Sequence, residues 1–133
     1  MGNFQKLIVW QKSKDLAVEI YKLTNDGKFN NDFRLRDQMR ASAVSIASNI
    51  AEGDELQTNK QSVNFFYIAK GSVAELKTQI IISNEIAYIS KIDADSFIIS
   101  CDEIGKMLTK LINIRKENEK PNKSNSKFLA PNT

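Results

Sequence analysis

Apolar residues recur every three or four positions along four successive stretches of the chain, and short polar segments separate these stretches. The first stretch spans about residues 8–24 and carries a broad apolar stripe that includes Trp10, Ile20 and Tyr21. The polar sequence at 25–27, which ends in glycine, is typical of a helix end. Because one face of an α-helix repeats with this period, each stretch predicts an amphipathic helix.

The second stretch begins near Asn31 or Asp32, and either side chain is suited to cap a helix. Its apolar positions follow at spacings of 4, 4, 3 and 4, at Leu35, Met39, Ala43, Ile46 and Ile50. Gly53 comes directly after this series, where a left-handed cap residue is often found. We therefore expect this helix to end at Gly53.

The third stretch opens with Thr58, and Gln61 follows three residues later, as in a capping box. Its apolar series is Phe66, Ala69, Val73, Leu76 and Ile80. We expect this helix to continue to about Ile89. The fourth stretch is expected to begin at Asp93 or Asp95 and to end near Lys116. Its seam keeps a strict spacing of 4-3-4-3-4, at Phe97, Cys101, Ile104, Leu108, Leu111 and Arg115.

Four amphipathic helices with short connections favour an all-α protein, an up-down-up-down four-helix bundle. The 133 residues fit one domain, and both prolines lie in the last 13 residues, so proline excludes no helix before them. We expect the bundle domain to span residues 1–118. The remaining residues, 119–133, are polar, basic and proline-containing, and we expect them to form a disordered tail.

The second helix carries unusually little charge, because residues 41–51 include no charged side chain. Beside the core stripe lies a polar stripe of Gln38, Ser42, Ser45, Asn49 and Glu52. A third face carries Val44, Ala47 and Ala51. A bundle helix normally has one apolar stripe and a charged outer face. We therefore favour a subunit interface on this helix, and the alternative is an especially buried helix within one bundle.

The third helix has a matching stripe of Ile68, Ser72, Glu75 and Gln79, and Gly71 lies beside it. A glycine in the middle of a helix lowers stability by about 1 kcal/mol relative to alanine, so it often marks a close helix contact. A buried hydrogen-bonded set between helices or subunits is expected from four side chains of these two stripes, Ser45, Asn49, Glu75 and Gln79. A polar ligand pocket is the alternative.

Composition argues against catalysis and against a metal or cofactor. The chain has no histidine, which is the commonest general base and metal ligand. The single cysteine, Cys101, lies on the apolar seam, where a buried small side chain is the expected role. Neither a Gly-x-Gly-x-x-Gly sequence nor a Walker loop is present. We expect a protein that is not an enzyme.

No apolar run approaches the roughly 18 residues that a membrane-spanning helix needs. Residues 1–11 hold no apolar stretch of signal-peptide length. A single cysteine also agrees with a reducing compartment. We therefore expect a cytoplasmic protein without a membrane partner.

Basic residues gather near the two ends of the chain. Residues 106–133 hold 7 basic and 2 acidic side chains, a net charge of +5. Residues 41–105 hold 4 basic and 9 acidic side chains, a net charge of −5. Clustered basic residues are typical of phosphate contacts. The candidates are Arg34, Arg36, Arg40, Lys110, Arg115, Lys116, Lys120, Lys123 and Lys127.

Residues 38–53, QMRASAVSIASNIAEG, resemble the 23S-rRNA intervening-sequence proteins, a family of small bacterial proteins. Ile8-Val9-Trp10-Gln11 with Ile20-Tyr21 is similar to the first helix of that family, and 68–76 is similar to its third. The resemblance covers about residues 4–115. Two positions depart from the family pattern: Ala41 stands where a second arginine is common, and Ala47 stands where a proline is common.

The resemblance implies a left-handed four-helix bundle and a homopentameric ring. The family that the chain resembles also includes accessory proteins of diversity-generating retroelements, which bind a reverse transcriptase and nucleic acid. Two functions are therefore open. One is an oligomeric scaffold that binds RNA, DNA or a nucleic-acid enzyme with low sequence specificity. The other is a protein–protein adaptor that binds no nucleic acid.

Overall fold

The computed structural model describes residues 3–25, 27–56 and 58–119. Four long helices account for most of them: α1 (Ile8–Leu23), α2 (Phe33–Glu55), α3 (Asn59–Glu85) and α4 (Lys91–Glu119). Two short 3-10 helices precede α1 and α2, namely η1 (Phe4–Lys6) and η2 (Gly27–Asn31). The described residues contain four α-helices and no β-strand, which confirms the all-α prediction.

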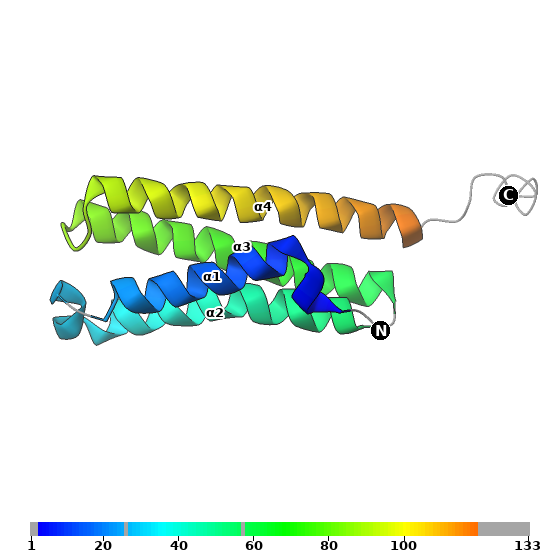
Figure 1. Ribbon diagram of the computed structural model, residues 1–133, viewed down its shortest axis with the longest axis horizontal. Coiled ribbons are helices and arrows are strands. Elements are labelled where there is room, and N and C mark those ends of the chain that lie inside the picture. The colour runs from blue at the N-terminus through cyan, green and yellow to red at the C-terminus, as the bar shows by residue number, and fades with distance from the viewer. Residues whose placement is uncertain (1–2, 26, 57, 120–133) are drawn as a thin grey trace, which may run out of the picture.

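Successive helices run in opposite directions and lie side by side along the length of the molecule (Figure 1). Each helix contacts the next one in the chain, and α1 also contacts α4, so the four helices enclose a common core. α1 has 16 residues whereas α4 has 29. The shorter first helix therefore covers only part of the length of the bundle.

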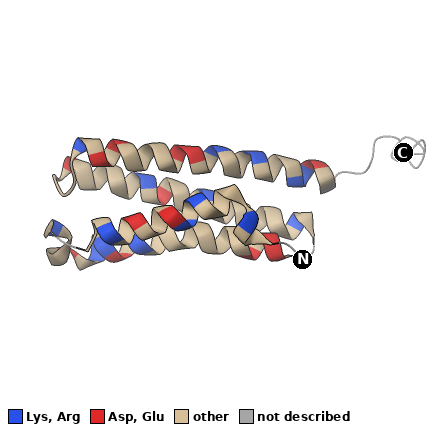
Figure 2. Ribbon diagram, in the orientation of Figure 1, with Lys and Arg blue, Asp and Glu red and all other residues tan. Residues whose placement is uncertain are grey.

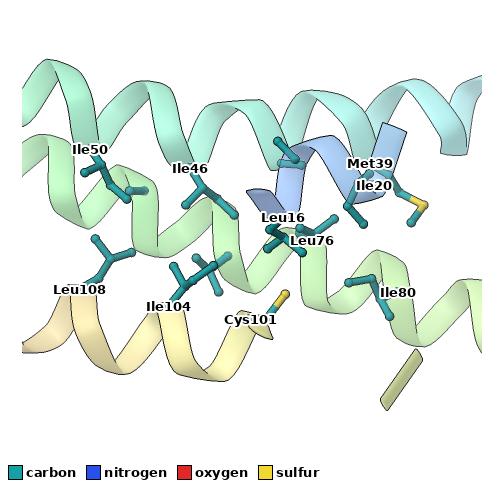
Figure 3. Close-up of a cluster of buried hydrophobic side chains, with 14 of the residues drawn as sticks. Leu16, Ile20, Met39, Ile46, Ile50, Leu76, Ile80, Cys101, Ile104 and Leu108 are labelled. Carbon is teal, nitrogen blue, oxygen red and sulfur yellow. The ribbon is translucent and has the colours of Figure 1, made fainter. Parts of the chain in front are cut away.

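The core is a continuous set of apolar side chains contributed by all four helices (Figure 3). The apolar positions expected on α2 and α3 are buried except for Leu35, which is half-buried. Met39, Ile46, Phe66 and Leu76 have no exposed surface. On α4, Cys101 and Leu108 have none either. The three-and-four residue spacing therefore identified the buried face of each of these helices correctly.

Two helix starts lie where capping residues predicted them. The Asp32 carboxylate accepts a hydrogen bond of 3.2 Å from the backbone N–H of Leu35, and α2 begins at the next residue. The Thr58 hydroxyl accepts a 3.2 Å bond from the backbone N–H of Gln61, and α3 begins directly afterwards. Such caps satisfy N–H groups that the first helical turn leaves without a partner.

The predicted end of α2 at Gly53 is wrong. The helix continues through Gly53 to Glu55, and Gly53 does not have the positive φ of a left-handed cap. A Cβ atom at this position would lie 2.7 Å from Cε1 of Phe66. Gly53 therefore allows α2 and α3 to approach closely.

The other helix limits also differ from those expected. α3 ends at Glu85 and not near Ile89, because the chain turns at Ala87, whose φ is +64°. α4 begins at Lys91, and the hydroxyl of Ser90 accepts a 3.1 Å bond from the N–H of Asp93. α4 also continues past Lys116 to Glu119. The predicted disordered tail, apart from its first residue, lies outside the described residues.

Candidate functional site

The charge-free part of α2 lies at the surface of the chain. Ala41 and Ser48 are exposed, and Val44 is 41% exposed. Only the stripe that carries Met39 and Ile46 faces the core. The alternative of an especially buried helix within one bundle is therefore wrong, and the small residues on the outer side need another explanation.

A groove of about 560 Å³ runs between α1 and α2, and we call it the α1–α2 groove. Its lining from α2 includes Val44, Ala47 and Ala51, the three residues predicted to share one face. Because two of these are alanines, the backbone of α2 is accessible to a second helix at close range. Phe4 and Trp10 also line the groove, and their rings lie edge to face with centroids 5.1 Å apart.

The α1 side of this groove was not predicted as an interface. Val18 and Tyr21 line it, and each is 45% exposed. The apolar stripe of the first stretch is broader than one core-facing helix needs, and this breadth was the available signal. Tyr21 was included in that broad stripe, and the structure places it at the groove.

The polar stripe of α2 forms a ladder of hydrogen bonds with α3. The hydroxyl of Ser42 donates to Oε1 of Glu75 at 2.9 Å, and the hydroxyl of Ser72 donates to that of Ser45 at 2.9 Å. The Asn49 amide donates to the Ser45 hydroxyl, also at 2.9 Å. Of the predicted set, Ser45 and Asn49 bond to each other, whereas Glu75 bonds to Ser42, which the prediction did not include. The ladder lies within one chain and joins α2 to α3.

Other members of the predicted stripe lie at the edges of this ladder. Gln38, Glu52 and Gly71 are exposed. Gln79 is buried, and its Oε1 atom has no hydrogen-bond partner among the described residues. The ladder is therefore a seam between two helices whose outer edge reaches the surface.

The arginines predicted as phosphate contacts on α2 are partly engaged within the chain. The Arg36 guanidinium pairs with Asp37 at 3.0 Å and lies over a phenylalanine ring. The Arg40 guanidinium donates to the hydroxyl of buried Thr24 at 2.9 Å and lies over the Tyr21 ring. Arg34 is exposed. Arg34 is therefore the member of this group that is best placed to bind a ligand.

The basic residues of α4 lie at the other end of the bundle, far from the first turns of α2 (Figure 2). Arg115 pairs with the buried carboxylate of Asp54 at 2.8 Å, and Lys116 donates to the Tyr67 hydroxyl at 2.8 Å. Lys110 is exposed. Lys120, Lys123 and Lys127 lie outside the described residues. The structure therefore does not bring the two predicted basic groups together.

Cys101 is fully enclosed, and burial raises the pKa of its thiol to about 12. Relative to an ordinary thiol of pKa about 8.5, the thiolate fraction at pH 8 falls about a thousand-fold. We expect the folded protein to react with a thiol-specific reagent at pH 8 at least 100 times more slowly than the urea-unfolded protein. Equal rates measured by absorbance would contradict the buried position of this side chain.

Within the part of the chain that the structure describes, no group of three metal-binding side chains is found. No helix in the same part is long and apolar enough to cross a membrane. The described residues present an exposed apolar groove, a polar seam and two separate basic ends.

Comparison with known proteins agrees with the fold and identifies the family. A solved structure of a protein of unknown function from the S23 ribosomal protein family of Bacteroides thetaiotaomicron matches with a TM-score of 0.72 and 28% identity. The match covers 79% of this chain and 98% of the other. A search of curated proteins finds no match. The model of the 23S rRNA-intervening sequence proteins matches residues 5–110, and the chain belongs to that family.

Proposed function

We propose that this protein is a self-assembling, non-enzymatic scaffold and that the α1–α2 groove is buried when copies associate. The observation that carries the proposal is the exposed apolar lining of this groove. Val18, Tyr21 and Val44 are each more than 40% exposed on the same side of the molecule. Contiguous apolar surface of this kind is typical of a protein interaction site.

The shape of the groove suits a helix better than a small molecule. It is open along one side, and alanines on both helices, Ala17, Ala47 and Ala51, leave room for a partner backbone. The family resemblance favours copies of the same chain as partners, a left-handed bundle and a homopentameric ring. A cytoplasmic location is part of the same proposal.

Ala47→Glu is expected to convert the assembly into monomers of 15.0 kDa. The new carboxylate would be transferred from water into an apolar contact without a partner, and such a charge opposes association strongly. Light scattering at micromolar concentration measures the mass. Asn113→Glu is the matched control, because this exposed residue on α4 lies away from the groove. A wild-type mass of one subunit, or an unchanged mass for Ala47→Glu, contradicts the proposal.

Low-specificity binding of RNA or DNA is a second candidate function, and it would suit an accessory scaffold of a nucleic-acid enzyme. The observation that favours it is the +5 charge of residues 106–133. Assembly would multiply this charge and raise the local potential. The engagement of Arg36, Arg40 and Arg115 within the chain favours the adaptor alternative, which involves no nucleic acid.

Replacing Lys120, Lys123 and Lys127 by serine is expected to weaken RNA binding and to leave assembly intact. Wild-type binding should be lost between about 50 and 200 mM salt, because neutralised phosphates release counterions. Gel shift and light scattering measure the two properties separately. If the wild-type assembly changes the gel mobility of neither RNA nor DNA at low salt, the result contradicts nucleic-acid binding and favours the adaptor function.

A further inference from the structure

A second groove, of about 500 Å³, runs between α3 and α4, and we call it the α3–α4 groove. Its floor is made of small or apolar side chains, with Val73 and Ala74 from α3 and Cys101 and Gly105 from α4. The hydroxyl of Thr109, which also lines the groove, donates to the backbone carbonyl of Gly105 at 3.1 Å and is therefore already engaged. The floor offers little to a polar ligand.

The shape of this groove follows the two helices that form it. α3 and α4 lie side by side (Figure 1), and the lining spans residues 70–77 of the first and 101–109 of the second. Each span is about two helical turns long, or roughly 12 Å. Near the middle, a Cβ atom added at Gly105 would meet no atom within 4 Å outside its own helix backbone. The groove is therefore long enough and open enough to receive part of another helix.

Lysines border the groove on both helices. Lys70 and Lys77 line it from α3, and Lys106 lines it from α4. The Lys77 ammonium pairs with the Asp102 carboxylate at 2.8 Å, so these two charges offset each other. Lys70 and Lys106 are exposed and form no ion pair within the described part of the chain. Although residues 41–105 carry a net charge of −5, two of their four basic side chains border this groove, which is locally positive.

We propose that the α3–α4 groove binds an acidic amphipathic helix of a partner protein. The apolar face of that helix would cover the groove floor, as in other complexes in which a helix lies in a groove. Acidic side chains on its two flanks would pair with Lys70 and Lys106, which have no such partner in the chain. Phosphates of a nucleic acid would find the same two cations but would gain nothing from the apolar floor. This inference goes beyond the proposed self-assembly, because it concerns other helices and a partner of another kind.

The probe is a fluorescent helical peptide about five turns long, with leucine and alanine on one face and glutamate along both flanks. A second peptide has lysine in place of glutamate. In fluorescence anisotropy, the full-length wild type should bind the glutamate peptide at least about ten-fold more tightly than the lysine peptide. Lys70→Glu combined with Lys106→Glu should reverse this preference. Lys60→Glu combined with Lys110→Glu is the matched control, since it changes the net charge equally at two exposed positions outside the groove.

Gly105→Leu should fill the groove and weaken binding of the glutamate peptide at least about ten-fold, with the fold verified by circular dichroism. Equal binding of the two peptides by the wild type, or binding of neither, overturns the inference. So does a change in assembly mass caused by Gly105→Leu, since another copy would then cover the groove. RNA binding that is lost in the Lys70→Glu, Lys106→Glu variant, without binding of the glutamate peptide, would assign the groove to phosphates instead. A monomeric wild type that binds the glutamate peptide selectively would contradict only the proposed self-assembly.

Discussion

Arg115→Ala is expected to lower the free energy of unfolding by about 3 kcal/mol, because it leaves a buried carboxylate without its partner. The Asp54 side chain is 6% exposed and the Arg115 side chain 21%, and their charged atoms lie 2.8 Å apart. The guanidinium also lies 5.4 Å from the centre of the Phe66 ring. Removing one member of such a pair costs far more than removing an exposed charge.

Urea unfolding of the full chain at one fixed concentration measures this effect, since assembly adds to the apparent stability. Lys110→Ala is the matched control on the same helix, because Lys110 is exposed, and its expected change is below about 0.5 kcal/mol. Asp54→Ala combined with Arg115→Ala should recover part of the loss. Unchanged stability with weaker RNA binding would instead favour the phosphate-binding role that the sequence predicted for Arg115.

Local sequence signals predicted the starts of α2 and α3 and most of the core. Asp32 and Thr58 act within three residues of themselves, and their neighbours in the chain are enough to identify them as caps. The core stripes are equally local, since helix geometry places residues three and four apart on one face. Positions such as Ile46 and Leu108 are fully buried as their spacing predicted.

Contacts between residues far apart in sequence could not be predicted in this way. Asp54 and Arg115 are separated by 61 residues, and no local pattern indicates that they meet. The start of α4 shows a different difficulty. Ser90, Asp93 and Asp95 lie within one short segment, and the side chain of each is of a type that can cap a helix. Only the structure shows that the Ser90 hydroxyl accepts the capping bond.

The candidate site was predicted in part, and the reason lies in the composition of α2. Absence of charge identified Val44 and Ala47 as an unusual face, and both line the groove in the structure. Ser45 and Asn49 bond as expected, whereas Ser42 and Ser72, which make the bonds between the helices, were not in the predicted set. That the groove and the seam are two separate surfaces depends on how the helices pack.

Gly53→Ala is expected to destabilise the fold by about 1–2 kcal/mol, although alanine is the better helix former by about 1 kcal/mol. The new methyl group would lie 2.7 Å from Cε1 of Phe66 and 3.1 Å from Cβ of Phe65. Phe66 has no exposed surface, so its ring cannot move aside without disturbing the core. Overpacking of this kind costs about 1–3 kcal/mol and outweighs the gain in helix propensity.

Gly105→Ala on α4 is the matched control, because a methyl group there would meet no atom within 4 Å. Helix propensity should then act alone and raise the free energy of unfolding by about 0.5–1 kcal/mol. The two substitutions, measured by urea unfolding at the same protein concentration, should therefore differ in sign. Phe66→Leu should reduce the loss caused by Gly53→Ala, since the shorter side chain frees the space that the methyl group needs. Equal stabilisation by Gly53→Ala and Gly105→Ala would show that α2 and α3 do not approach so closely at this point.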